Sequence, residues 1–201
     1  MIFCVTNQAL CKVDFLQQLR RIASAKPDAI ILREKRLSEE VYELLAQQVL
    51  EICKANRVQL ICNPFIRVAE QLAIPVQISL SRLSQTGTLS VPFGVSVHSL
   101  EEAIQAEQAG ATYLIAGHIF ETSCKPDLPP RGLLFLREIC QTVAIPVLGI
   151  GGIHVQNAAS VLQTGAAGVC VMSDFMQADA PESLMQKLRQ QDCSETNRSL
   201  F

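Results

Sequence analysis

The chain has 201 residues, with 17 lysines and arginines against 19 aspartates and glutamates, so its formal net charge is −2 at pH 7. This even balance excludes a surface that is basic overall, of the kind that binds nucleic acid or anionic membranes. Apolar residues make up 49% of the chain and charged residues only 18%, which predicts elements buried on two sides and a length that suits one domain.

Short runs rich in Val, Ile and Leu alternate along the chain with longer segments of helical periodicity. The apolar runs predict strands at residues 2–6, 29–32, 58–62, 76–78, 93–97, 113–116, 147–150 and 168–172. The segments between and after them predict helices at residues 38–56, 64–72, 99–109, 132–143, 154–163 and 181–191.

The clearest helix is predicted at residues 38–56. Ser38 is a good N-cap, and apolar residues at spacings of three and four predict the buried face: Val41, Leu44, Leu45, Val49 and Ile52. The helix at 99–109 has the same design, because Ser99 and Glu102 form a capping box.

Strands that are apolar on both faces and alternate with helices predict a parallel sheet covered by helices. Eight such units predict an α/β fold of one (β/α)8 TIM barrel over residues 1–191, followed by a polar tail at 192–201. A doubly wound open sheet is the alternative.

A cytoplasmic protein without membrane contact is expected. The amino-terminal residues lack a basic leader, and the longest apolar run, at 144–153, is too short to span a bilayer. None of the eight cysteines forms a C-x-x-C pair, and Cys4, Cys62 and Cys170 lie in predicted strands, which favours buried thiols over disulfides or metal ligands. Cys124, beside Lys125, is either a partly ionised thiol or a chance loop cysteine.

Active sites of such barrels lie at the carboxyl ends of the strands. Gly151 and Gly152 follow the seventh strand, and Met172 and Ser173 follow the eighth. Backbone amides exposed by glycines and the start of a following helix bind phosphate, so these two loops predict a phosphate site. A tight turn that needs glycine is the alternative.

Three further strand ends carry informative residues. Arg33 and Lys35 follow the second strand, where they could clamp an anion or form a solvated charge run. His118 follows the sixth strand, where it is either a general acid or base or a structural histidine. The other two histidines, His98 and His154, precede or begin helices and are interpreted as structural, although His154 is close enough to the glycine loop to contact a ligand.

The third, fourth and fifth strands end without carboxylates. Asn63 is followed by Pro64, and no acidic residue lies between Glu70 and Glu101. A magnesium-diphosphate site needs carboxylates that hold the metal, so neither a metal nor another cofactor is expected.

These loops resemble the thiamin phosphate synthase/TenI family, over residues 5–188 or so. The matches are the Leu-Arg-x-Lys run at 32–35, Asn63, the Gly-x-(Ile/Val)-Phe-x-Thr stretch at 117–122 with Lys125 after it, and the turn at 150–152 with Ser173. The resemblance implies the same barrel fold. In synthases of this family, a proline commonly follows the first glycine of the motif after the sixth strand, and an aspartate follows the asparagine after the third strand. An acidic residue follows the fourth strand, and a glutamine lies two residues before the arginine of the motif after the second strand.

This chain has His118, Pro64 and Ile31 at three of those positions and no acid at the fourth, so it is more similar to the TenI branch, the thiazole tautomerases. That likeness implies an isomerase of thiamin biosynthesis, which aromatises the carboxythiazole phosphate tautomer by proton transfer. His118 would be the catalytic group, and the substrate would contact Arg33, Lys35, Asn63, Thr122, Lys125, Gly151, Gly152, Met172 and Ser173.

The partner expected is this small thiazole phosphate, with a homo-oligomer left open. Two alternatives remain. One is a magnesium-dependent thiamin phosphate synthase that joins the thiazole phosphate to a pyrimidine diphosphate. The other is a regulatory barrel that binds thiazole phosphate without chemistry.

Overall fold

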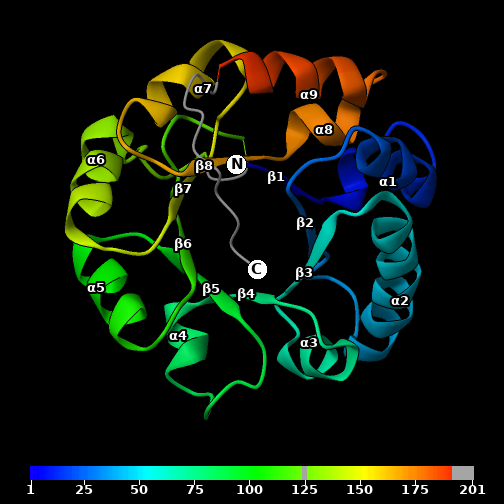
Figure 1. The fold of residues 1–201 in the computed structure, drawn as a ribbon, viewed down its shortest axis with the longest axis horizontal. Helices are drawn as coiled ribbons and strands as arrows, with labels where there is room; N and C mark the ends of the chain where they lie inside the picture. The colour runs from blue at the N-terminus through cyan, green and yellow to red at the C-terminus, as the bar shows by residue number, and fades with distance from the viewer. Residues whose placement is uncertain (124–125, 192–201) are drawn as a thin grey trace.

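The computed structural model describes residues 1–123 and 126–191, in which eight parallel strands form a closed barrel in chain order (Figure 1). β1 pairs with β8, with Ile2 opposite Val169, and this pairing closes the sheet. The barrel prediction is therefore confirmed over the open sheet. The strands are β1 (Ile2–Val5), β2 (Ala29–Arg33), β3 (Gln59–Asn63), β4 (Val76–Ser79), β5 (Phe93–Val97), β6 (Tyr113–Gly117), β7 (Val147–Ile150) and β8 (Gly168–Val171).

Helices surround the barrel as an outer ring (Figure 1). The six predicted helices lie within two residues of their expected ends: α2 (Glu39–Asn56), α3 (Ile66–Leu72), α5 (Leu100–Gln108), α6 (Gly132–Thr142), α7 (Val155–Leu162) and α9 (Pro181–Gln190). The sequence analysis missed α1 (Phe15–Ser24), α4 (Leu80–Leu83), α8 (Ser173–Gln177) and the 3-10 helix η1 (Gln8–Leu10). For α1 the signal is present, because Asp14 caps the helix and Phe15, Leu19 and Ile22 bury one face.

The buried face of α2 differs from the prediction. Val41 and Leu44 are 51% and 63% exposed, whereas the buried residues of the helix are Tyr42, Ala46, Val49, Ile52 and Cys53. The apolar pattern is compatible with either set of residues as the buried face of the helix, since Leu45 lies between the two sets. The Tyr42 hydroxyl decides the outcome, because it forms buried hydrogen bonds to β2 and β3 that only one rotation of the helix permits.

The core has two parts, one inside the barrel and one between the strands and the helices. Successive side chains of a strand face opposite sides, so Phe3, Ile31, Ile61 and Leu148 fill the interior while their neighbours pack against helices. Both faces of each strand are thus covered, and this explains the low share of charged residues.

Cys4, Cys62 and Cys170 are buried in strands as predicted. Burial raises the pKa of the Cys62 thiol to about 11, so this group stays protonated near neutral pH. Cys124 lies outside the described residues. None of the helices in the described part of the chain is long and apolar enough to cross a membrane.

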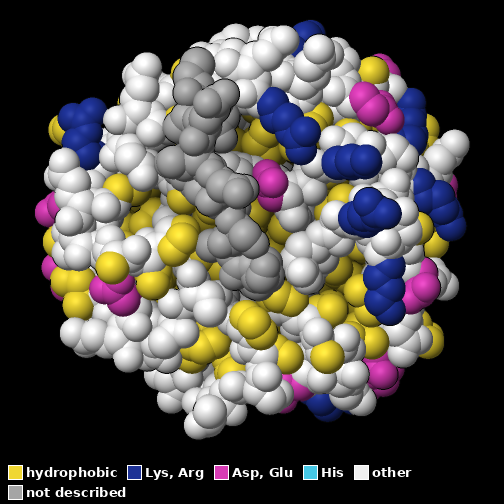
Figure 2. Space-filling model, viewed as in Figure 1, with side chains coloured by type: hydrophobic (Ala, Val, Ile, Leu, Met, Phe, Trp, Pro, Cys, Tyr) yellow, Lys and Arg dark blue, Asp and Glu magenta, His cyan; other side chains and the backbone are white. Residues whose placement is uncertain are grey.

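The cationic side chains are unevenly distributed. On the face drawn in Figure 2, lysines and arginines gather on the side of α1, α2 and α9. The remainder of that face is mostly neutral, with acidic side chains scattered over it. This distribution agrees with the expectation that the surface is not basic overall.

Candidate functional site

The open end of the barrel is formed by the carboxyl ends of the strands, called the rim below. Arg33 at the end of β2 lies opposite Asn63 at the end of β3, and Ser79 of β4 lies opposite Ser96 of β5. Because side chains alternate along a strand, the side chains of these four residues are on the interior face of the barrel. Arg33, Ser79 and Ser96 are at least partly exposed, whereas the interior residue one step deeper on each strand is buried, so the exposed part of the interior is the layer at the rim.

The charged run after β2 divides into a buried and an exposed part. Glu34 is only 9% exposed, and its Oε1 accepts hydrogen bonds from the Thr6 hydroxyl at 2.7 Å and from the Gln8 backbone N–H at 3.0 Å. The Thr6 hydroxyl oxygen accepts a further bond from the Arg33 N–H at 2.9 Å. Glu34 therefore joins the ends of β1 and β2, while Lys35 is exposed.

Glu34 gives a prediction about pH. Burial raises the pKa of its carboxyl group above the ordinary value, although its hydrogen bonds oppose this. A folded-state pKa above the unfolded one means that the native state binds more protons, so this group's contribution falls as pH rises through the interval between the two values. Glu34→Gln keeps an acceptor oxygen and removes the charge. We expect its stability relative to wild type to increase as pH rises above the ordinary pKa of a glutamate carboxyl, as measured by urea unfolding; an unchanged difference would contradict the expectation.

Asn63 is anchored by two hydrogen bonds at the end of β3. Its side-chain Nδ2 donates to the Gln77 carbonyl at 2.7 Å, and its backbone N–H donates to the Tyr42 hydroxyl at 3.0 Å. The same hydroxyl donates to the Leu32 carbonyl at 2.7 Å. Asn63 Oδ1 is buried and has no hydrogen-bond partner in the described part of the chain.

Tyr42→Phe tests this anchor. The change leaves a buried N–H of Asn63 and a buried carbonyl of Leu32 without their partner, and each such loss costs about 1 to 3 kcal/mol. We expect the free energy of unfolding to fall by roughly that amount in urea titrations, since the ring itself still packs against Phe65. Equal stability of the two proteins would show that the hydroxyl contributes no net stability.

His118 is buried, with 5% of its surface exposed. Its Nε2 lies 3.1 Å from the carbonyl oxygen of Leu128 in the β6–α6 loop. A carbonyl oxygen only accepts, so Nε2 carries the proton, and in the neutral imidazole Nδ1 then carries the lone pair. Nδ1 makes no hydrogen bond to residues 1–123 or 126–191. The imidazole thus has the tautomer that a base requires.

The glycine turn after β7 packs directly on the segment that carries His118. Gly151 and Gly152 have φ angles of +100° and +65°, and a Cβ on Gly151 would lie 2.3 Å from the Cβ of His118. The Ile119 N–H donates to the Ile150 carbonyl at 2.9 Å, and the Phe120 N–H donates to the Gly151 carbonyl at 3.0 Å. Packing alone therefore requires these glycines. This agrees with the alternative interpretation of the motif, a tight turn that needs glycine.

The same turn keeps the features of a phosphate site. The amides of Gly151 and Gly152 donate to no group of the described chain. Ser173 begins α8, a short extra helix directly after β8. Loops after the seventh and eighth strands, together with a short extra helix, are the usual phosphate site of barrel enzymes. The phosphate prediction is compatible with this geometry and stays a prediction.

The structure distributes the other predicted site residues along the rim. Met172 precedes α8 and is partly exposed, as is Thr122 in the β6–α6 loop, while Lys125 lies outside the described residues. Sequence reasoning missed the polar interior residues Gln77 and Ser96, which share a hydrogen bond of 3.0 Å. Their signal was polar residues at alternating positions within apolar strands.

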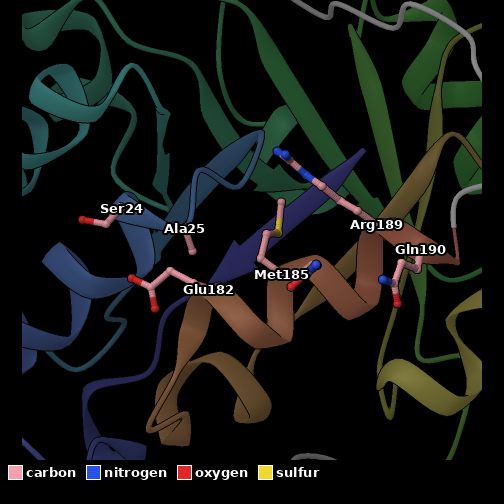
Figure 3. Close-up of a pocket in the computed structure, with 7 residues that line it drawn as sticks. Ser24, Ala25, Glu182, Met185, Arg189 and Gln190 are labelled. Carbon is pink, nitrogen blue, oxygen red and sulfur yellow. The ribbon is translucent and has the colours of Figure 1, made fainter.

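A surface hollow of about 560 Å³ lies elsewhere on the molecule. Figure 3 shows Glu182, Met185 and Arg189 along α9, with Ser24 and Ala25 at the end of α1 opposite them. Helices of this barrel run antiparallel to the strands, so the end of α1 lies at the amino ends of the strands, away from the rim. The hollow is therefore separate from the predicted site.

The comparisons with known proteins agree on one family. The model of the family described as thiamine monophosphate synthase matches residues 2–175. Thiamine-phosphate synthase 2 of Streptococcus pneumoniae is 35% identical over 196 residues, which cover 92% of this chain and 91% of that protein. Thiamine-phosphate synthase of Roseiflexus castenholzii is 40% identical over 172 residues, which cover 80% of this chain and 74% of that protein.

A solved structure gives the same result. Thiamine phosphate pyrophosphorylase of Pyrococcus furiosus superimposes with a TM-score of 0.83 at 29% identity, and the match covers 94% of both chains. The resemblance inferred from the rim motifs is thus confirmed at the level of the family. Neither the relatives nor the structural match identifies the tautomerase branch. The chain belongs to the thiamine monophosphate synthase family, and so to the enzymes of thiamin biosynthesis.

Proposed function

We propose that this enzyme is a thiazole tautomerase, which converts the phosphorylated carboxythiazole tautomer into its aromatic form. The observation that carries the proposal is the His118 imidazole, whose Nε2–H is held by the Leu128 carbonyl and whose Nδ1 is thereby left as a base. It lies against the glycine turn, where the phosphate would bind. A base fixed beside a phosphate site is what this reaction requires.

The reaction moves one proton and shifts two double bonds. The C–H bond at ring carbon two breaks, and its electron pair becomes a ring double bond to nitrogen. The existing double bonds shift in turn, and the exocyclic alkene carbon forms a new C–H bond. Nothing is oxidised or reduced, and aromaticity supplies the driving force. The protein needs only to position the ring, hold its charges and transfer protons.

The other rim residues have roles that suit the charges of this substrate. The amides of Gly151 and Gly152 and the hydroxyl of Ser173 would bind the phosphate. Arg33, at the interior end of β2, would pair with the ring carboxylate, because a guanidinium matches a carboxylate with two parallel hydrogen bonds. Lys35, Asn63, Thr122, Lys125 and Met172 remain proposed substrate contacts.

A second candidate is thiamin phosphate synthase, which joins a thiazole phosphate to a pyrimidine diphosphate with magnesium. The names of the relatives favour this candidate over the first, since those named above are synthases or a pyrophosphorylase. The donor set of this chain disfavours it. Pro64 and Leu80 follow β3 and β4, and within the described residues no three His, Cys, Asp or Glu side chains group as metal ligands.

One assay with three arms distinguishes the candidates. The first arm gives the purified protein the tautomer and follows aromatisation by NMR. The second gives thiazole phosphate, pyrimidine diphosphate and magnesium, and follows thiamin phosphate. The third measures thiazole phosphate binding by calorimetry. We expect turnover in the first arm only. Thiamin phosphate in the second arm would make the enzyme a synthase, and binding without turnover in either would make it a regulatory barrel.

A further inference from the structure

α6 presents an apolar side chain to the outside of the barrel. Leu134 is 78% exposed, the highest value among the large apolar side chains in the described part of the chain. Its neighbours Leu133 and Phe135 pack partly against the core, and Phe135 keeps part of its surface exposed. The helix belongs to the outer ring, on the opposite side of the barrel from α2 (Figure 1). One exposed leucine is ordinary on a protein surface, but charged residues flank this one in a defined pattern.

Opposite charges lie on either side of Leu134 and Phe135 on one helix face. Arg131 lies three residues before Leu134, and Glu138 lies three residues after Phe135. The four residues therefore have the spacing i, i+3, i+4 and i+7, which places them on the same face. The Arg131 guanidinium lies over the Phe135 ring, with its Cζ 5.5 Å from the ring centroid, so these two side chains are together as the spacing predicts.

The two charges do not neutralise each other within the helix. Arg131 and Glu138 are seven residues apart, about 10 Å along the axis, whereas ion pairs on a helix form between residues three or four apart. Both side chains are exposed, and neither forms an ion pair with residues 1–123 or 126–191. The face thus offers a partner a cation, an apolar centre and an anion, in that order.

This order is complementary to itself when a second copy of α6 runs in the opposite direction. A two-fold axis through the midpoint between Leu134 and Phe135 places each Leu134 against the Phe135 of the other copy. The same axis places each Arg131 against the Glu138 of the other copy, because both lie three residues outside the apolar pair. A two-fold interface uses the same surface on both subunits, so the partner that matches both the charges and the apolar centre is a second copy of this chain.

The start of α6 is held firmly to the barrel, so the face is preformed. The Arg131 backbone N–H donates to the His118 carbonyl at 2.9 Å, and the Gly132 N–H donates to the Ile119 carbonyl at 3.1 Å. Association therefore loses little backbone freedom at this end of the helix.

The exposed apolar residues of α2 do not have the same arrangement. Val41 and Leu44 are 51% and 63% exposed, but the charged residues next to them in the helix, Glu40 and Glu43, are both acidic. Two copies of α2 would bring like charges together, which disfavours association.

We propose that α6 is the interface of a homodimer, in which two copies of the helix pair in opposite directions. Leu134 and Phe135 form the centre of the interface, and Arg131 pairs with the partner copy's acidic end at both edges. One helix from each subunit buries less than the roughly 1,200 to 2,000 Å² of stable interfaces, so the expected dissociation constant is about 1 to 100 µM. The dimer does not depend on which reaction the barrel catalyses.

The experiment measures the mass of the full chain by sedimentation equilibrium over about 1 to 500 µM, which spans that range of dissociation constants. Arg131→Glu leaves acids at both charged positions, and Glu138→Arg leaves cations at both. Each variant alone should dimerise at least about 10-fold more weakly, because two attractions become two repulsions. An equimolar mixture of the two variants should form a heterodimer of about wild-type affinity, since every contact then joins opposite charges.

Three further variants separate this pairing from general surface effects. Leu134→Ser should abolish dimerisation, whereas Leu44→Ser, at the exposed leucine of α2, should leave it unchanged. Arg137→Glu makes the same charge change on α6, at a residue turned about 100° from Glu138, and should have little effect. Circular dichroism checks that each variant folds. A wild-type chain that stays monomeric over the whole range would overturn the proposal. So would a mixture that dimerises no better than its components, or equal weakening by Arg137→Glu and Arg131→Glu.

Discussion

His118→Ala is expected to slow aromatisation of the thiazole tautomer by about 100- to 10,000-fold, the usual contribution of a general base. The physical reason is the loss of Nδ1, which in the present tautomer carries the lone pair that accepts the proton. Stopped-flow mixing with freshly generated tautomer, followed by absorbance of the aromatic ring, measures the rate. Ligand binding, measured by calorimetry with thiazole phosphate, should change much less than the rate.

Two comparisons separate chemistry from packing at this position. His118→Gln places an amide N–H where Nε2 lies, so it keeps a donor for the Leu128 carbonyl but offers no group that takes a proton. We expect it to unfold at nearly the wild-type urea concentration and to remain as slow as the alanine variant. Recovery of wild-type rates in His118→Gln would mean that the histidine only supports the β6–α6 loop.

Gly151→Ala has the second large expected effect. The φ angle of +100° is strained for any residue with a Cβ, and that Cβ would lie 2.3 Å from the Cβ of His118. Left-handed strain costs about 1 to 2 kcal/mol, and forced overpacking adds roughly 1 to 3 kcal/mol. We expect a loss of stability of about 2 to 5 kcal/mol in urea titrations.

The same substitution should also reduce turnover, because it displaces the imidazole. A misplacement of about 1 Å can cost about 100-fold in rate. Gly110→Ala is the matched control, since Gly110 also has a left-handed φ, +88°, but nothing lies within 4 Å of a Cβ there. It should lose only the strain energy and keep full activity. Equal effects of the two variants would show that contact with His118 is unimportant.

The secondary structure could be predicted well because strong local signals specify it. Ser38 and Ser99 cap α2 and α5 as their sequences indicate, and the buried strands are continuous apolar runs. The rotation of α2 could not be predicted, since Val41 and Tyr42 belong to competing stripes. The bonds from Tyr42 to Leu32 and Asn63 decide between them, and those partners are 10 and 21 residues away.

The candidate site was predicted in part for the same reason. Glycines, histidines and arginines after strands can be found from spacing alone. The environment of Glu34 could not be found from spacing, because its burial depends on Thr6 and Gln8 from the neighbouring strand end. His98 was interpreted as structural since it precedes a helix, and the fold adds a contact of its ring Nδ1 with Glu102 Oε2 at 3.3 Å.

The sequence by itself determined the order of the eight strands and of six of the helices, the family and the residues at the strand ends, since these depend on local periodicity, capping and motif spacing. The tertiary structure alone decided which of those residues lie together: Gly151 against His118, and Glu102 against the His98 ring. Closure of the sheet through the β1–β8 pair brings all eight strand ends to one rim, and contacts between chain-distant groups leave no periodic signal in the sequence.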